Sequence, residues 1–169
     1  MKRIIFIVSL WSLFLLGACS NEEVKYDGAF LRIAVVGDIP ELISEKIYFE
    51  SISLSEFSEK KMENSTDFDA VMITPVMFEK ASNDDLVQVY NSSELPFIFF
   101  DSTKRHFPFI REGVTYETAD WGSLDNGSHT TIYLSNVDGS REDAWHFYLK
   151  DEKELNKLYK EIFQKVETL

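Results

Sequence analysis

This chain contains little cysteine, glycine, proline or positive charge. Of its 169 residues, one is cysteine, seven are glycine and four are proline, and 17 Lys and Arg stand against 29 Asp and Glu. A lone cysteine excludes an intrachain disulfide, so the fold depends on its hydrophobic core. The acidic excess gives a formal charge of −12 at pH 7. A surface of that sign repels nucleic acid and anionic lipid headgroups, which disfavours nucleic-acid binding as a function.

The first twenty residues have the pattern of an export signal. A basic pair, Lys2 and Arg3, precedes an apolar run over 4–16, and the run ends in the letters GAC at 17–19 before the polar letters SNEE. A charged start, an apolar middle and a small-residue cleavage site are typical of a signal peptide. The run is shorter than the roughly 20 residues that a membrane-spanning helix needs. The sequence therefore predicts export rather than a permanent span.

Four residues at the end of this run, Leu16, Gly17, Ala18 and Cys19, resemble the lipobox of bacterial lipoproteins. The resemblance implies that a diacylglyceryl group is joined to the Cys19 sulfur and that a dedicated peptidase cuts just before this cysteine. Two acyl chains would anchor the protein durably, because each buried methylene contributes about 0.8 kcal/mol. The expected location is the extracytoplasmic face of the cell membrane, or the outer membrane where the cell has one. An ordinary signal peptide that is removed together with its cysteine is the alternative.

Cleavage before Cys19 would divide the chain into a signal peptide at 1–18, a lipidated tether at 19–29 and a folded domain at 30–169. Taking 18 residues from 169 leaves a mature chain of 151 residues. Lys2 and Arg3 are lost, so 15 basic residues stand against 29 acidic ones and the formal charge becomes −14. A chain of this length forms one domain of ordinary size with a sizeable core.

Short apolar runs predict the strands of this domain. Three runs lack alternation, as strands buried on both faces of a parallel sheet do, and they cover 31–36, 68–73 and 96–100. The segment 46–54 alternates apolar and polar residues and is expected at an edge of the sheet. Near the C-terminus, 130–135 and 144–149 flank a polar turn and predict an antiparallel hairpin.

Helix signals alternate with these strands. Three helices are predicted, each from a residue suited to a helix start: 55–63 capped by Ser55, 75–82 from Pro75 and 83–90 capped by Asn83. The segment 152–166 places its apolar residues three and four positions apart and predicts an amphipathic helix that covers one face of the sheet. The predicted fold class is α/β, with a single three-layer domain, a mainly parallel sheet, a C-terminal antiparallel hairpin and a final helix.

The letters LRIAVVGDIPE and FDAVMITPVM resemble the first and third strands of response-regulator receiver domains, each with its following loop. The resemblance implies a receiver-like or flavodoxin-like sheet, but it speaks to fold more than to function. That family needs an acidic pair after the first strand and an aspartate phosphoryl acceptor at the end of the third. Here Gly37 precedes Asp38, and Ile73 and Thr74 stand at the second position. Phosphoryl transfer is therefore not expected.

A ligand site in such a sheet is expected beyond the carboxyl ends of the strands. The candidate ligand-binding residues at these ends are Asp38, Thr74, Asp101, Lys104, Arg105 and His106. The segment 102–128 adds aromatic residues in a long irregular stretch, and such loops often carry function. The basic trio would meet a carboxylate or phosphate, with the aromatic residues as an apolar wall. The alternative is that these polar residues only cap turns and balance neighbouring acids.

Catalytic and metal sites have weaker signals. Ser102, His106 and either Asp38 or Asp101 could form a hydrolase set, but Ser102 lies in DST and not in a glycine-flanked nucleophile elbow. His129 and His146 could approach each other across the predicted hairpin. No two histidines have the i, i+4 spacing of a helical metal site, so no metal or other cofactor is expected.

These observations predict an extracytoplasmic lipoprotein that acts as a non-catalytic binding or envelope-interaction module. Its expected partners are the membrane, through the lipid on Cys19, and a small molecule or an envelope protein. A degenerate or unrecognised enzyme that uses Asp38, Asp101 and His106 is the alternative class. A protein that modulates a neighbouring membrane complex is a third.

Overall fold

The computed structural model describes residues 25–42, 44–58, 67–119, 125–135 and 142–169. The predicted signal peptide and Cys19 lie outside these residues. Tyr26, inside the range predicted as a tether, is already part of the packed domain. The Tyr26 side chain is 6% exposed, its hydroxyl donates to Glu167 Oε2 at 3.0 Å, and its ring meets Phe163 edge to face. The N-terminal end of the fold is thus tied to its C-terminal end.

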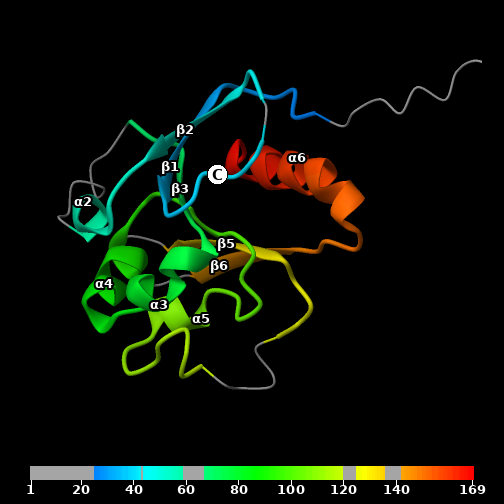
Figure 1. Ribbon diagram of the computed structural model, residues 1–169. Helices are drawn as coiled ribbons and strands as arrows, with labels where there is room; N and C mark the ends of the chain where they lie inside the picture. Colours follow the sequence, from blue (N-terminus) through cyan, green and yellow to red (C-terminus); the bar gives the residue numbers. More distant parts are fainter. Residues whose placement is uncertain (1–24, 43, 59–66, 120–124, 136–141) are drawn as a thin grey trace, which may run out of the picture.

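A six-stranded mixed sheet organises the domain, in the order β2-β1-β3-β4-β5-β6 (Figure 1). The strands are β1 (Leu31–Val36), β2 (Ile47–Ser51), β3 (Ala70–Ile73), β4 (Phe97–Phe99), β5 (Thr130–Ser135) and β6 (Glu142–Phe147). The first four in spatial order pair in parallel, whereas β5 and β6 are each antiparallel to the preceding strand. The predicted α/β class is confirmed.

Burial explains which strands are central. Every residue of β3 and β4 is buried, as the predicted runs without alternation require. Among the described strands, β2 pairs only with β1, and it exposes part of its length, which confirms the predicted edge strand. The six residues between β5 and β6 lie outside the described part of the chain, so the turn of the predicted hairpin is not described.

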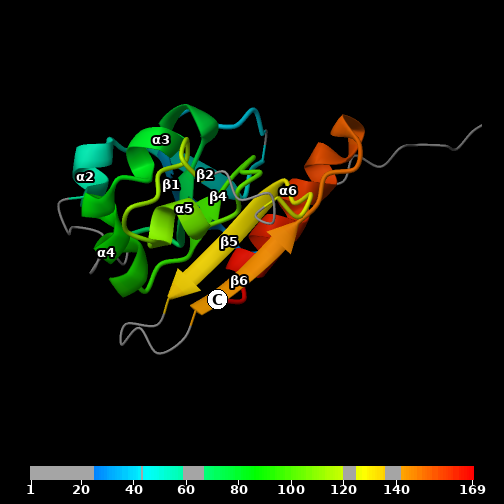
Figure 2. The same ribbon diagram turned by 90° about the horizontal axis from the view of Figure 1, so that it is seen from below.

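Helices cover both faces of the sheet. The described helices are α2 (Leu54–Ser58), η2 (Pro75–Met77), α3 (Phe78–Ala81), α4 (Asp84–Ser92), α5 (Phe107–Ile110), η3 (Glu152–Glu154) and α6 (Leu155–Val166). Figures 1 and 2 show α6 on one side of the sheet and α2, α3, α4 and α5 on the other. The predicted amphipathic C-terminal helix is confirmed, because Leu158, Ile162 and Phe163 of α6 are buried against one face of the sheet.

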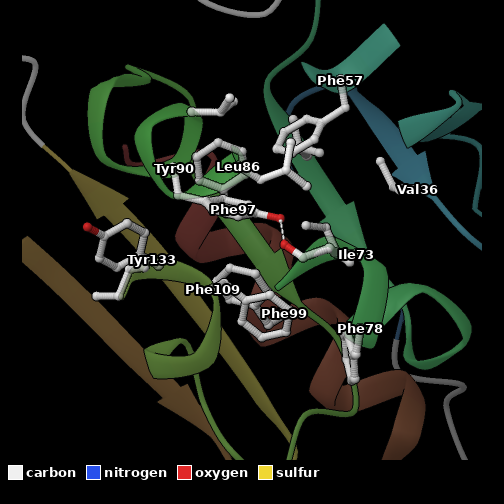
Figure 3. Close-up of a cluster of buried hydrophobic side chains, with 14 of the residues drawn as sticks. Val36, Phe57, Ile73, Phe78, Leu86, Tyr90, Phe97, Phe99, Phe109 and Tyr133 are labelled. Carbon is white, nitrogen blue, oxygen red and sulfur yellow. Dashed lines mark hydrogen bonds between the residues drawn. The ribbon is translucent and has the colours of Figure 1, made fainter. Parts of the chain in front are cut away.

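Aromatic rings fill the core between the sheet and the α2–α5 layer (Figure 3). Tyr90 of α4 lies at the centre, with ring centroids 5.4 Å from Phe57 and 5.0 Å from Phe97. Phe99 of β4 and Phe109 of α5 stack with centroids 4.0 Å apart. The Tyr90 hydroxyl donates to the Ala81 carbonyl at 2.7 Å, so this buried polar group is satisfied. These contacts hold α5 against the sheet.

The cap of α2 differs from the prediction. Ser53 rather than Ser55 begins the helix: the Glu56 N–H donates to Ser53 Oγ at 3.2 Å, and the Ser53 N–H donates back to Glu56 Oε2 at 2.8 Å. This reciprocal pair is a capping box, which needs Glu or Gln three residues after the cap, and Glu56 meets that condition only for Ser53. The last residues of the predicted helix, 59–63, lie outside the described part.

Other predicted helix starts hold. Pro75 occupies the first turn after Thr74, although this turn is 3-10 and becomes α-helical only at Phe78. Asn83 caps α4, with its Oδ1 accepting the Asp85 N–H at 3.0 Å. The segment 102–128, predicted to be irregular, contains the short helix α5. Pro108, Phe109 and Ile110 of this helix are buried, and Phe109 and Ile110 belong to the aromatic core, which accounts for a helix where no cap signal was found.

Candidate functional site

The turn after β1 uses two of the predicted site residues for its own structure. Gly37 has φ +116°, and the exposed Asp38 follows it. The Asp38 N–H donates to Thr74 Oγ1 at 2.9 Å, and Thr74 is 3% exposed. Thr74 therefore holds the β1 turn against the end of β3. This contact brings Asp38 and Thr74 together, as their strand-end positions predicted.

Asp101 faces a histidine that the sequence did not single out as its partner. Its Oδ1 lies 3.5 Å from His129 Nε2, and His129 Nδ1 lies 2.8 Å from Thr130 Oγ1. Burial lowers the pKa of His129, and the negative charge of Asp101 opposes this effect. The order carboxylate, imidazole, hydroxyl resembles a nucleophile relay, but Thr130 is fully buried and no substrate reaches its hydroxyl. The set fixes the start of β5.

Lys104 and Ser102 also stabilise the loop that carries them. Ser102 is fully buried, and its hydroxyl donates to the Arg105 carbonyl at 2.9 Å. The Lys104 Nζ donates to the carbonyls of Tyr116 and Glu117 and lies 5.0 Å from the Tyr116 ring centroid. The ammonium thus closes the loop over 104–117 by binding main-chain oxygens. This role accounts for one of the three cations that the sequence assigned to a ligand.

His106 is buried in a stack of rings between α5 and the sheet. It is 5% exposed, and its ring lies 5.1 Å from that of Tyr133, with 17° between the planes, and 6.2 Å from that of His146. Its Nδ1 is buried and has no hydrogen-bond partner among the described residues. Burial lowers the pKa of His106 to about 4, and the charges of His146, Arg105 and Arg111 add to this effect. The imidazole is therefore neutral at pH 7.

Two arginines lie over the ring of Phe107, which is the neighbour of His106. The guanidinium carbons of Arg105 and Arg111 lie 5.2 Å and 5.4 Å from the Phe107 ring centroid. His146 of β6 lies beside them, and both burial and the charge of Arg105 lower its pKa. We call Arg105, His106, Phe107, Arg111 and His146 the arginine cluster. It gathers positive charge and apolar surface in a chain whose formal charge is −12.

Asn91 of α4 joins the two elements that support the arginine cluster, α5 and β5. Its Oδ1 accepts the Tyr133 hydroxyl at 2.8 Å, and its Nδ2 donates to the Ile110 carbonyl at 3.2 Å. Its own carbonyl accepts the Ser135 hydroxyl at 2.9 Å. The Asn91 side chain thus connects the end of α5 to Tyr133 of β5, and its main-chain carbonyl adds a second contact to β5 at Ser135. The His106 ring rests on this fixed platform.

The six predicted site residues therefore fall into local groups. Asp38 and Thr74 share one turn, Asp101 pairs with His129, Lys104 closes a loop, and Arg105 and His106 lie together in the arginine cluster. That these residues bind a ligand stays a prediction. Sequence reasoning missed Arg111 and His146 as neighbours of His106. The alternation in AWHFYL was the available signal, because it places His146 opposite to Trp145 and facing the α5 side.

His129 and His146 do not approach each other, contrary to the interpretation of the hairpin. The His129 ring meets Phe100, which packs on Tyr159 of α6, whereas the His146 ring stacks over His106 on the other face of the sheet. Regular alternation would place His129 on the face of Thr131, whose hydroxyl contacts His146. The register slips just before β5, where the His129 N–H donates to the Phe147 carbonyl although Phe147 is the sheet partner of Thr130, and His129 lies on the other face. Both rings are partly buried rather than free on the surface.

The described surface is hollowed beside β6 and also between α2 and α4. One hollow of about 300 Å³ lies between the end of β6 and α6 and is lined by His146, Phe147, Tyr148, Lys150, Glu154, Lys157, Leu158 and Glu161. Another of about 380 Å³ lies between α2 and α4 and is lined by Leu54, Ser55, Ser58, Lys80, Asn83, Asp85 and Leu86. Of the predicted site residues, none lines either hollow. The first borders the arginine cluster through His146.

Among the residues that the structure describes, no group of three or more His, Cys, Asp and Glu side chains could hold a metal ion. Within the same ranges, every helix is too short or too polar to cross a membrane. Comparisons with protein-family models, with curated proteins and with solved structures find no match to this chain.

Proposed function

We propose that this protein is a lipid-anchored, extracytoplasmic binding module held at the membrane through Cys19. The observation that carries the anchor is the lipobox pattern Leu16, Gly17, Ala18 and Cys19 after a charged start and an apolar run. The burial of Tyr26 supports a close attachment, because only the residues from Cys19 to Tyr26 then separate lipid and fold. Seven extended residues span at most about 25 Å. The domain would therefore lie close to the bilayer surface.

The anchor is tested by Cys19→Ala in the full chain. Without the thiol no thioether-linked lipid forms, so we expect uncleaved precursor and a shift of most of the protein out of the detergent phase in phase partitioning. Mass spectrometry of the mature wild-type N-terminus should show a diacylglyceryl-modified cysteine. Ser20→Ala is the matched control and should be processed normally. Normal cleavage and full membrane retention of Cys19→Ala would contradict the anchor.

We propose the arginine cluster as the binding surface, with an oxyanion-bearing ligand, a carboxylate or a phosphate, as the class it takes. The supporting observation is the pair of guanidinium groups over the ring of the partly exposed Phe107. Guanidinium groups bind carboxylates and phosphates through paired, charge-assisted hydrogen bonds. Phe107 offers an apolar contact for the rest of such a ligand. Because the rest of the chain is acidic, the arginine cluster would be a local positive region that attracts anions.

Titration with inorganic phosphate tests this surface. We expect saturable chemical-shift changes in the ¹H–¹⁵N spectrum at residues 105–111 and 146, with a dissociation constant in the millimolar range that corresponds to about 4 kcal/mol. Arg111→Gln should weaken binding at least fivefold, because one of two charged donors is lost. Lys153→Gln removes an equal charge from an exposed site on η3 and should leave the affinity unchanged. Equal losses in both variants would indicate only a general charge effect and would contradict a site.

For the finer fold class we propose a receiver-like or flavodoxin-like relationship. The parallel part of the sheet has the order β2-β1-β3-β4, which agrees with the start of the order 2-1-3-4-5 of flavodoxin-like folds. Two features depart from that pattern: β5 is antiparallel to β4, and the described residues between β1 and β2 form no helix. The hairpin turn between β5 and β6 stays a prediction. Asp38 contacts Thr74, Asp101 contacts His129, and His106 stacks on Tyr133. These three residues do not form one catalytic set, so no observation favours the enzyme alternative.

A further inference from the structure

His146 of β6 belongs to the arginine cluster, and its two ring nitrogens have different surroundings. Nδ1 lies 3.0 Å from Thr131 Oγ1 on the neighbouring strand β5, and Thr131 is fully buried. Nε2 forms no hydrogen bond to a described residue. Among the described side chains, only His106 Nδ1 and Ser128 Oγ are buried without a hydrogen bond, so His146 Nε2 meets solvent. One nitrogen of His146 thus faces the interior and the other faces the surface.

The buried threonine determines which nitrogen holds the ring proton. The Thr131 hydroxyl has one partner among the described residues, His146 Nδ1. Buried hydroxyl groups almost always donate to an acceptor, so Thr131 donates to Nδ1 and the ring proton lies on Nε2. Burial lowers the pKa of His146, and the charge of Arg105 adds to this effect, so the ring is neutral at pH 7. His146 therefore presents an uncharged N–H donor at the surface.

We infer that the Nε2–H of His146 is a third donor for the ligand of the arginine cluster, and that this ligand is a phosphate monoester rather than a carboxylate. The inference rests on the arginine cluster as the proposed binding surface. The guanidinium groups of Arg105 and Arg111 lie over the Phe107 ring, and the N–H donors of a guanidinium lie in its plane. Stacking on the ring therefore leaves the direction of these donors toward a ligand unchanged.

Charge and donor number both favour phosphate. A phosphate monoester has a charge of about −1.5 to −2 at pH 7 and three strong acceptor oxygens. The two guanidinium groups nearly balance that charge, and with His146 they make three donor groups. A carboxylate has a single negative charge and two oxygens, so it would leave one donor group and one positive charge without a partner.

The charges in the hollow that His146 borders balance each other. This hollow of about 300 Å³ is lined by two lysines and two glutamates, Lys150, Lys157, Glu154 and Glu161. The hollow thus adds no net attraction for an anion. The charge of Arg105, in contrast, acts on His146 and on the His106 ring that stacks against it, with 6.2 Å between the ring centroids. The third donor therefore lies within electrostatic range of the guanidinium groups.

The nitrogen resonances of the imidazole test the assigned tautomer. In a long-range ¹H–¹⁵N spectrum of the full chain in detergent, above neutral pH, His146 should show a protonated Nε2 and an unprotonated Nδ1. Addition of methyl phosphate should shift the Nε2 resonance and leave that of Nδ1 nearly unchanged. A protonated Nδ1, or a rapid mixture of both tautomers, would overturn the donor role of His146.

Affinity ratios test the donor and the ligand class together. Methyl phosphate should bind the wild type roughly tenfold more tightly than acetate, because it gains a charge-assisted hydrogen bond. His146→Phe keeps a ring against His106 but has no donor, so it should lose about tenfold in affinity for methyl phosphate and almost none for acetate. His146→Gln restores an N–H group and should recover most of the loss. His129→Phe, on the other face of the sheet, is the matched control and should change neither affinity.

Phosphate monoesters occur both in soluble molecules and in the headgroup of phosphatidic acid. Glycerol 3-phosphate and dihexanoyl phosphatidic acid, titrated in the same detergent, distinguish these sources. A preference of roughly tenfold for the lipid would identify a headgroup, and equal affinity would identify a soluble ester. Either result supports the phosphate class, whereas weaker binding of both than of acetate would overturn it.

The arginine and histidine variants separate this inference from the proposed binding surface. If Arg111→Gln weakens methyl phosphate binding and the folded His146→Phe does not, the surface stands and the third donor is overturned. Equal affinity of the wild type for acetate and methyl phosphate would overturn the phosphate class alone. No binding of either anion would overturn both the surface and the inference. The nitrogen spectrum and the wild-type affinity ratio keep these outcomes measurable even where His146→Phe does not fold.

Discussion

Gly37→Ala is expected to lower the free energy of unfolding by about 2–5 kcal/mol, which for a domain of this size is a fall of roughly 10 °C in melting temperature. Two costs combine. Gly37 has φ +116°, which L side chains rarely adopt, and a Cβ there would lie 2.2 Å from Thr74 Oγ1 and 3.2 Å from Met77 Cγ. Thr74 would have to move, and the hydrogen bond from Asp38 would be lost.

The matched control is Gly113→Ala. Gly113 also has a positive φ of 76°, but an added Cβ would have no atom within 4 Å. Only the backbone cost of about 1 kcal/mol then remains. In urea unfolding followed by circular dichroism, the midpoint of Gly37→Ala should lie at a clearly lower urea concentration than that of Gly113→Ala. Equal urea midpoints for the two variants would show that the turn after β1 accommodates a methyl group, and Thr74 would lose its assigned role of holding this turn.

Apolar patterning located the sheet because burial on both faces leaves a simple trace in sequence. The runs that became β1, β3 and β4 needed no knowledge of their neighbours, since every position there except Arg32 is apolar and buried whatever packs on it. The cap of α2 was harder. Ser53 and Ser55 are both good caps, and only the reciprocal bond from Glu56 distinguishes them.

The sequence predicted the region of the candidate site but not the contacts of its individual side chains. Strand ends placed Asp38 and Thr74 together correctly, because parallel strands finish at one edge. The side chains of Lys104 and His106 are two residues apart, yet one binds loop carbonyls and the other stacks on Tyr133. That division depends on the short helix α5 and on the contact with β6. Contacts between segments about 40 residues apart leave no local pattern to read.

Acidification is expected to destabilise the protein through His106. In the unfolded chain a histidine titrates near pH 6.5, whereas burial lowers the pKa of His106 to about 4 in the fold. Between these values the unfolded chain binds a proton that the folded chain does not. The free energy of unfolding is therefore undiminished above pH 6.5 and decreases as the pH falls toward 4, by up to about 3 kcal/mol in total. His129 and His146, whose pKa values are also lowered, change stability in the same direction.

His106→Phe isolates this contribution. Phenylalanine keeps a ring on Tyr133 and removes the Nδ1 that has no described partner, so the variant should be at least as stable as the wild type at pH 8. Between pH 6.5 and 4 the difference in unfolding free energy should grow in favour of the variant by about 1.4 kcal/mol per pH unit, the value for one proton. His129→Phe should show a smaller change, because Asp101 offsets part of the burial effect at that position. Carboxylates that protonate at low pH affect all three proteins alike and cancel in the comparison. Parallel pH curves for the wild type and His106→Phe would mean that water reaches His106 in the folded state, and the packed interface between α5 and β6 would then have to be more open than its ring contacts require.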